Sequence, residues 1–88
     1  MVDENPITPD QCRAARALVG WSRADLAVQC GVAASTLSDF EGGKRVPYAR
    51  TLADVKEALE TAGVTFISGD ERAGEGVRRS LPALKIEP

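Results

Sequence analysis

Glycines interrupt the first part of this chain at intervals too short for any long helix. Gly20, Gly31, the Gly42-Gly43 pair and Gly63 each follow a stretch in which apolar residues recur at helical spacing. That spacing puts apolar side chains on one face of an α-helix, and glycine is the residue that most often ends one. The chain is therefore restricted to short helices packed around a shared core. We expect them over residues 9–19, 22–30, 33–42 and 49–62.

Start signals and apolar stripes support these helices. Thr8, Pro9 and Gln11 form a capping box with proline at the first helical position, and Ser22 with Asp25 repeats the signature in a weaker form. The stripes predict which side chains form the core. They are Cys12, Ala15, Leu18 and Val19, then Leu26, Ala27 and Cys30, then Leu37 and Phe40, and finally Leu52, Val55, Leu59 and Ala62.

After Gly63 the sequence pattern changes from helix to strand. Residues 64–67 are β-branched and aromatic, residues 68–76 are polar and rich in glycine, and residues 77–80 are a candidate second strand. The expected fold class is mainly α: a helix-turn-helix bundle of about four helices followed by a short β-strand or hairpin. We divide the chain into an N-terminal arm (1–7), a helix-turn-helix domain (8–63), a strand or hairpin (64–80) and a flexible tail (81–88).

Composition argues against an enzyme. The chain of 88 residues contains no histidine, the commonest general base and metal ligand, and it has no Gly-rich phosphate loop. We expect no catalysis, no cofactor and no metal.

Cys12 and Cys30 are too few and too far apart for a disulfide framework, so we expect reduced, structural thiols. No apolar run is long enough for a membrane helix and the start lacks a signal-peptide pattern, which predicts a cytoplasmic protein.

From about Thr8 to Gly63 the sequence resembles the phage repressor and Cro type of helix-turn-helix domain, the XRE family. The residues that carry the resemblance match in order and spacing. They are Gly20-Trp21-Ser22-Arg23, Leu26-Ala27, Gly31-Val32, Ser35-Thr36-Leu37, Phe40-Glu41-Gly42-Gly43-Lys44-Arg45, Pro47 and Thr51-Leu52. Residues 63–80 also resemble the ending of very small members, in which a strand or hairpin replaces a fifth helix.

The resemblance implies double-stranded DNA as the partner and transcription regulation as the function. In such proteins the second helix, here 22–30, crosses the phosphate backbone, and the third, here 33–42, lies in the major groove as the recognition helix. Arg23, Lys44 and Arg45 match phosphate-contacting positions, and Tyr48 beside them either offers its hydroxyl to a phosphate or has no such role. The positions that point at base edges or flanking phosphates are matched by Ala34, Ser35, Thr36, Ser38 and Asp39.

The family pattern also pairs an Arg at the position of Arg16 with a Glu at the position of Glu41. Such a pair would hold the recognition helix at a fixed angle; the alternative is two independent surface charges. Trp21 is the only Trp, and we expect a core anchor rather than a surface on which bases stack.

Two features depart from a strong DNA-binding pattern. The formal net charge is −2 and the isoelectric point about 5.0, so binding must rest on local cations rather than on an all-round positive field. The recognition helix also lacks Arg, Lys, Gln and Asn, the residues best suited to bidentate base contacts. We therefore expect modest base readout supported by DNA shape. Asp39 either accepts a hydrogen bond from the amino group of a cytosine or orients a neighbouring Arg.

Dimerisation is the role we expect for the segment after Gly63. Val64, Thr65, Phe66 and Ile67 form a strand too short to stand alone, and it can pair with its copy in a second subunit or with the strand that begins at Val77 in either chain. An intramolecular hairpin in a monomer is the alternative.

We expect a homodimeric regulator, more often a repressor than an activator, that reads a palindromic operator. The competing hypothesis is a protein-binding module, such as an antitoxin or anti-activator, with weak or auxiliary DNA binding. The acidic isoelectric point and the small side chains of the recognition helix favour that alternative.

Overall fold

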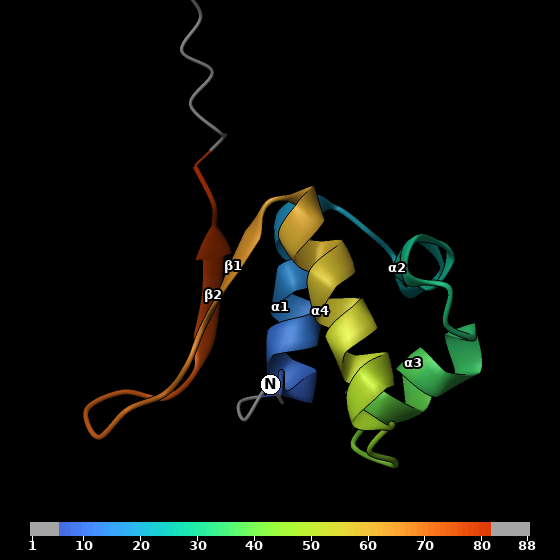
Figure 1. The fold of residues 1–88 in the computed structure, drawn as a ribbon, viewed down its shortest axis with the longest axis horizontal. Helices are drawn as coiled ribbons and strands as arrows, with labels where there is room; N and C mark the ends of the chain where they lie inside the picture. Colours follow the sequence, from blue (N-terminus) through green and yellow to red (C-terminus); the bar gives the residue numbers. More distant parts are fainter. Residues whose placement is uncertain (1–5, 82–88) are drawn as a thin grey trace, which may run out of the picture.

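Four helices and one β-hairpin make up the fold of the computed structural model, which describes residues 6–81 (Figure 1). The helices are α1 (Pro9–Val19), α2 (Arg23–Cys30), α3 (Ala34–Glu41) and α4 (Ala49–Ala62), and the strands are β1 (Val64–Ile67) and β2 (Gly76–Arg79). The expected fold class, a mainly α bundle with a terminal hairpin, is confirmed. Most of the predicted arm (1–7) and tail (81–88) lies outside the described residues.

Element boundaries differ from the predicted ones by single residues. Helix α2 starts after Ser22 because that residue is its cap: the Ser22 hydroxyl accepts from the Asp25 N–H at 3.0 Å, and the Asp25 carboxylate accepts from the Ser22 N–H at 3.0 Å. Helix α3 starts after Ala33, whose backbone is extended and which has no capping side chain. Strand β2 starts at Gly76, one residue earlier than predicted, because Gly76 pairs with Ile67.

The core is built mainly from the predicted stripes. Its buried apolar members are Ile7, Cys12, Ala15, Leu26, Leu37, Phe40, Leu52, Val55, Leu59 and Val64. Ile7, assigned to the arm, is part of this core. One other prediction needs correction: Ala62 is exposed because it is the last helical residue of α4. Trp21 packs against the core as expected, and it is only partly buried because its other side borders a surface cleft.

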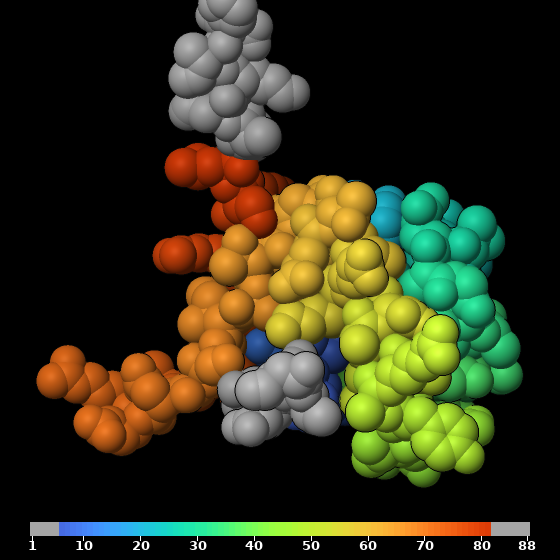
Figure 2. Space-filling model, in the orientation of Figure 1, coloured from blue at the N-terminus to red at the C-terminus, as the bar shows by residue number. Residues whose placement is uncertain are grey.

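The arrangement separates two surfaces of the molecule. Helices α1 and α4 pack together in the centre, α2 and α3 lie to one side, and the hairpin lies on the other side (Figure 1). In the space-filling view the loop of the hairpin projects away from the helical body (Figure 2). The recognition-helix candidate and the hairpin are therefore available to different partners.

One buried polar side chain joins the hairpin to the first helix. The Gln11 side-chain oxygen accepts from the Thr8 N–H at 2.9 Å, which completes the predicted capping box. Its amide nitrogen donates to the Ile67 carbonyl at 3.1 Å and to the Gly76 carbonyl at 2.9 Å. Ile67 and Gly76 face each other at the loop end of the antiparallel hairpin. Gln11 thus caps α1 and fixes the position of the hairpin at once.

Candidate nucleic-acid interface

Helix α3 has one buried face and one face open to solvent. Leu37, Phe40 and Glu41 are buried against the other helices. With 100° between successive residues, Ser35 and Asp39 lie on the opposite side of the helix. Ser35 is exposed and Asp39 is partly exposed. The outward face is therefore small and polar, so another surface can approach the helix backbone closely.

The flanks of this face lie beside different elements. On one side the Ser38 hydroxyl lies 3.5 Å from Nη1 of Arg23 in α2. On the other side Thr36 borders a cleft of about 440 Å³ that the segment leading into α4 also lines. Ala34 is exposed in the first turn. Ser35 and Asp39 thus form the outward face, Thr36 and Ser38 lie at its flanks, and Ala34 is exposed at the start of the helix.

An ion pair fixes the end of α3 against α1. Arg16 donates from Nε to Glu41 Oε2 at 2.8 Å and from Nη2 to Oε1 at 2.7 Å, in a bidentate contact. The Glu41 side chain is 1% exposed and that of Arg16 is 18% exposed. Cys12 also donates to the Glu41 carboxylate at 3.1 Å, and the Arg16 guanidinium donates to the Trp21 carbonyl at 3.1 Å. Arg13 donates to the Glu41 carbonyl.

This environment shifts the pKa values of its members. Burial acts to raise the pKa of Glu41, but the hydrogen bonds from Arg16 and Cys12 outweigh it and hold that pKa below its ordinary value. The hydrogen bond to Glu41 raises the pKa of Arg16. Burial, followed by the hydrogen bond to Glu41, strongly raises the pKa of the Cys12 thiol. The pair is therefore ionised, and Cys12 stays a protonated donor to it.

Arg23 lies at the entrance to this pair. Its Nε is 4.0 Å from Glu41 Oε1, and its side chain is about half exposed. It stands in the first turn of α2, where the partial positive charge of a helix N-terminus attracts anions. The Arg23 side chain therefore reaches from α2 toward Ser38 and Glu41 of α3 and stays accessible from solvent.

The turn after α3 brings two further cations back to the same surface. The Gly43 N–H donates to the Phe40 carbonyl at 3.0 Å, and the Lys44 N–H donates to the Asp39 carbonyl at 2.8 Å. Gly43 has φ +75°, in the left-handed region that glycine adopts at little cost. The chain reverses there, so that Arg45 Nη1 lies 3.8 Å from Asp39 Oδ2.

Comparison with known protein families matches residues 10–73 to a helix-turn-helix domain, which is more than half of the chain. The chain belongs to the helix-turn-helix domain family. No curated protein matches its sequence. A helix-turn-helix domain implies DNA binding and transcription regulation, and domains of this family are typically not enzymes.

Several exposed cations of this helix-turn-helix domain follow α3 in the sequence. Lys44 and Arg45 are exposed, and so is Arg50 in the first turn of α4, which the sequence interpretation missed although it follows the basic loop closely. Tyr48 between them is 86% exposed. Residues 6–81 carry equal numbers of acidic and basic side chains, so the acidic excess comes from the ends of the chain. The net charge therefore does not describe the surface around α3.

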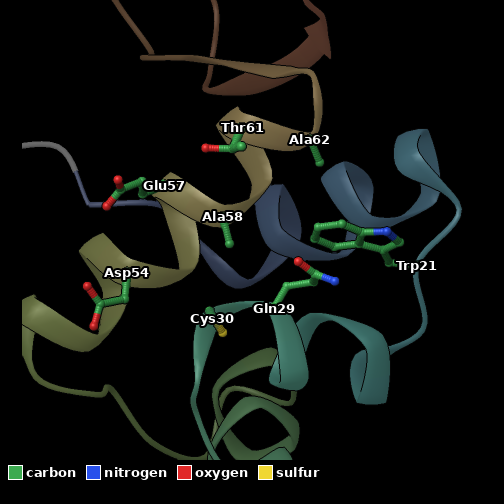
Figure 3. Close-up of a pocket in the computed structure, with 8 residues that line it drawn as sticks. All are labelled: Trp21, Gln29, Cys30, Asp54, Glu57, Ala58, Thr61 and Ala62. Atoms are coloured by element: carbon green, nitrogen blue, oxygen red, sulfur yellow. The ribbon is translucent and has the colours of Figure 1, made fainter.

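The helix-turn-helix domain has a second notable surface between α2 and α4. A cleft of about 590 Å³ is bordered by Trp21, Cys30 and acidic residues of α4 (Figure 3). Asp54 and Glu57 are the acidic residues that line it. Cys12 and Cys30 are free thiols, and burial raises the pKa of Cys30.

The five residues assigned to dimerisation lie in the hairpin, away from α3 (Figure 1). Phe66 and Val77 face each other in the register and pack against the core, where Val64 is buried. Thr65 shares a hydrogen bond with the Ser80 hydroxyl at 2.7 Å, and Ile67 is 38% exposed. The strands thus pair within one chain.

Two further observations concern residues 6–81. No helix among them has both the length and the apolar character needed to cross a membrane. In the same part of the chain, no group of three or more His, Cys, Asp or Glu side chains is arranged to hold a metal ion.

Proposed function

We propose that this helix-turn-helix domain is a sequence-specific transcription regulator of the phage repressor and Cro type, which acts as a dimer and as a repressor. One observation carries the proposal: the outward face of α3 is made of small polar side chains, with Arg23 beside Ser38 and Arg45 beside Asp39, and the exposed Lys44 precedes Arg45 in the turn. A helix with small side chains enters the major groove deeply, and Arg23 and Lys44 meet the phosphates beside it.

Phosphate contacts supply most of the affinity in this proposal. Arg23 reaches the backbone from the first turn of α2, Lys44 from the turn after α3, and the exposed Tyr48 hydroxyl adds a neutral donor. Each cation that neutralises a phosphate contributes about 0.9 to the slope of log affinity against log salt. The acidic residues at the two ends of the sequence are not among the residues proposed to contact phosphate.

Base contacts in this proposal come from small groups. Ser35 and Ser38 offer hydroxyls, Thr36 a hydroxyl and a methyl, and Ala34 a methyl that suits the thymine methyl group. None of these side chains makes a bidentate contact. Sequence-dependent DNA shape and the spacing of two half-sites therefore add to the specificity.

The free edge of β2 supports dimerisation. Strand β1 continues from α4 and contacts it, whereas β2 is the strand farther from α4 (Figure 1). The Ser80 N–H donates to the Gly63 carbonyl at 2.8 Å, so by the antiparallel alternation the backbone groups of Val77 and Arg79 point away from β1. Pairing of two β2 strands around a two-fold axis would satisfy those groups and join two recognition helices.

Selection of bound duplexes from a random DNA pool tests this function. The wild-type chain is expected to enrich a two-fold symmetric consensus whose half-site centres lie about 34 Å apart, one turn of DNA. A chain that enriches no sequence would contradict sequence-specific regulation. Enrichment of a single unsymmetrical half-site would contradict the dimer.

Val77 provides the matched variants for the dimer. Val77→Pro removes the outward N–H that the pairing of β2 strands needs, whereas Val77→Ala removes side-chain atoms and keeps that N–H. The proline variant is expected to sediment as a monomer and to enrich half-sites, while the alanine variant keeps the symmetric consensus. Equal sedimentation of both variants and the wild type as dimers would place the dimer contact elsewhere.

The cleft beside Trp21 favours a second candidate function, the binding of another protein. Its acidic residues Asp54 and Glu57 suit a basic partner segment, and the indole offers apolar contact area. Because this cleft lies between α2 and α4 rather than on the outward face of α3, both functions are compatible in one chain.

A further inference from the structure

We propose that Arg45, from the turn after α3, supplies the guanidinium that the recognition helix itself lacks and reads a G·C base pair, with Asp39 as its positioning residue. This inference rests on the proposed function and deepens it, because it names the side chain that determines specificity. Residues 34–41 contain no Arg, Lys, Gln or Asn. A bidentate reader of guanine in this protein must therefore come from outside the helix.

The backbone brings Arg45 back to the outward face of α3. The Lys44 N–H donates to the Asp39 carbonyl at 2.8 Å across the left-handed turn at Gly43. That bond fixes the residue immediately before Arg45 to the last turn of the helix. The Arg45 side chain consequently starts next to α3 instead of extending along the path of the loop.

Two observations then locate the side chain itself. Arg45 Nη1 lies 3.8 Å from Asp39 Oδ2, and Asp39 is on the side of α3 opposite its buried face. Arg45 and Thr36 also line the same cleft, of about 440 Å³. Thr36 and Asp39 are three residues apart, which makes them neighbours along one helix face. The guanidinium thus lies along the flank of the face that would enter the groove.

The chemistry of this pair suits a G·C base pair. A guanidinium donates two parallel hydrogen bonds to O6 and N7 of guanine in the major groove, the commonest specific contact. The Asp39 carboxylate restrains the long Arg45 side chain before binding, which reduces the entropy lost when it contacts a base. The same carboxylate can accept from the amino group of a cytosine. Both groups are accessible, with side chains 56% and 41% exposed.

Lys44 is the natural comparison because it precedes Arg45 in the same turn. Its side chain is exposed, and its ammonium is a point charge without the planar donor pair of a guanidinium. We expect Lys44 to contact phosphate only. The two neighbouring cations should therefore have different signatures in DNA binding.

The test sequences the DNA that wild type, Arg45→Ala, Lys44→Ala and Asp39→Ala each bind from one random duplex pool. Wild type is expected to prefer a G·C pair at one position of each half-site by about tenfold over the other pairs. Arg45→Ala should lose that preference and keep the rest of the consensus. Lys44→Ala should keep it while binding all sequences more weakly, with a salt slope lower by about one.

The Asp39→Ala variant distinguishes a positioning role of Asp39 from a merely structural one. Its G·C preference is expected to fall, while its affinity for mixed-sequence DNA stays equal or rises, because a carboxylate near the phosphates has been removed. Retention of the full G·C preference by Arg45→Ala would overturn the inference while leaving the proposed function intact. A wild type that enriches no sequence would instead contradict the proposed function itself.

Discussion

Replacing Glu41 by alanine is expected to lower the free energy of unfolding by about 3–5 kcal/mol, the cost of removing one partner of a buried ion pair. The loss would leave the Arg16 guanidinium, 18% exposed, without its bidentate partner and would deprive the Cys12 thiol of its acceptor. Folded domains are stable by only about 5–15 kcal/mol, so this is a large share. Urea unfolding of the wild type and of Glu41→Ala measures this difference in the free energy of unfolding.

Asp39→Ala is the matched control for this prediction. Asp39 is also in an ion pair with an arginine, but at 3.8 Å and on the surface, so its removal should change stability by less than about 1 kcal/mol. Equal melting temperatures for Glu41→Ala and Asp39→Ala would refute the stabilising role of the Arg16–Glu41 pair.

Lowering the pH should remove the stabilisation that the Glu41 carboxylate contributes. Because the folded-state pKa of Glu41 lies below its ordinary value, its contribution is present above that value and is lost as pH falls through the folded-state pKa. The difference in stability between wild type and Glu41→Gln should therefore be largest near neutral pH and should shrink below about pH 4.

Replacing Gln11 by glutamate should destabilise the domain by about 2–3 kcal/mol at neutral pH. The substitution keeps an oxygen that caps α1, but it replaces the amide donor with a carboxylate oxygen that faces the carbonyls of Ile67 and Gly76. Protonation would restore a donor, so the variant should regain stability toward acid pH relative to the wild type. Urea unfolding at neutral and acid pH measures both effects, and hydrogen exchange of the β1 and β2 amides locates them.

Thr8→Ala separates the cap from the hairpin contact. It removes the hydroxyl that accepts from the Gln11 N–H at 3.1 Å and leaves the amide nitrogen of Gln11 on the two carbonyls. A loss of about 1 kcal/mol with unchanged protection of the hairpin is expected. If Gln11→Glu were no more destabilising than Thr8→Ala, the hairpin contact would add nothing to stability.

The helices could be predicted because their signals are local. The capping boxes at Thr8 and Ser22 and the glycines after each stripe act within a few residues, and the boundaries agree within about one residue. Trp21 could not be assigned so well, because the packing of α2 against α4 decides which side of the indole is covered. The same holds for Ala62, whose exposure depends on how the end of α4 meets its neighbours.

Contacts between distant segments could not be predicted from signals in the neighbouring sequence. Gln11 has a complete role as a capping residue, so nothing near it indicates two hydrogen bonds to residues 56 and 65 positions further along the chain. The ion pair between Arg16 and Glu41 was expected from the family resemblance rather than from periodicity. The contact between Arg45 and Asp39 depends on the geometry of the turn at Gly43, which the Gly42-Gly43 pair alone leaves open.

Chemical-shift mapping of the nitrogen-15-labelled chain, during titration with duplex DNA at low salt, tests directly whether α3 contacts DNA. The amides of Ser35, Ser38 and Lys44 and the side-chain signal of Arg23 are expected to move. The indole N–H of Trp21, the only tryptophan, reports on the cleft between α2 and α4 and should stay still. Shifts centred on that indole with an unchanged α3, or no shifts at all, would contradict the assignment of α3 as the DNA-contacting helix.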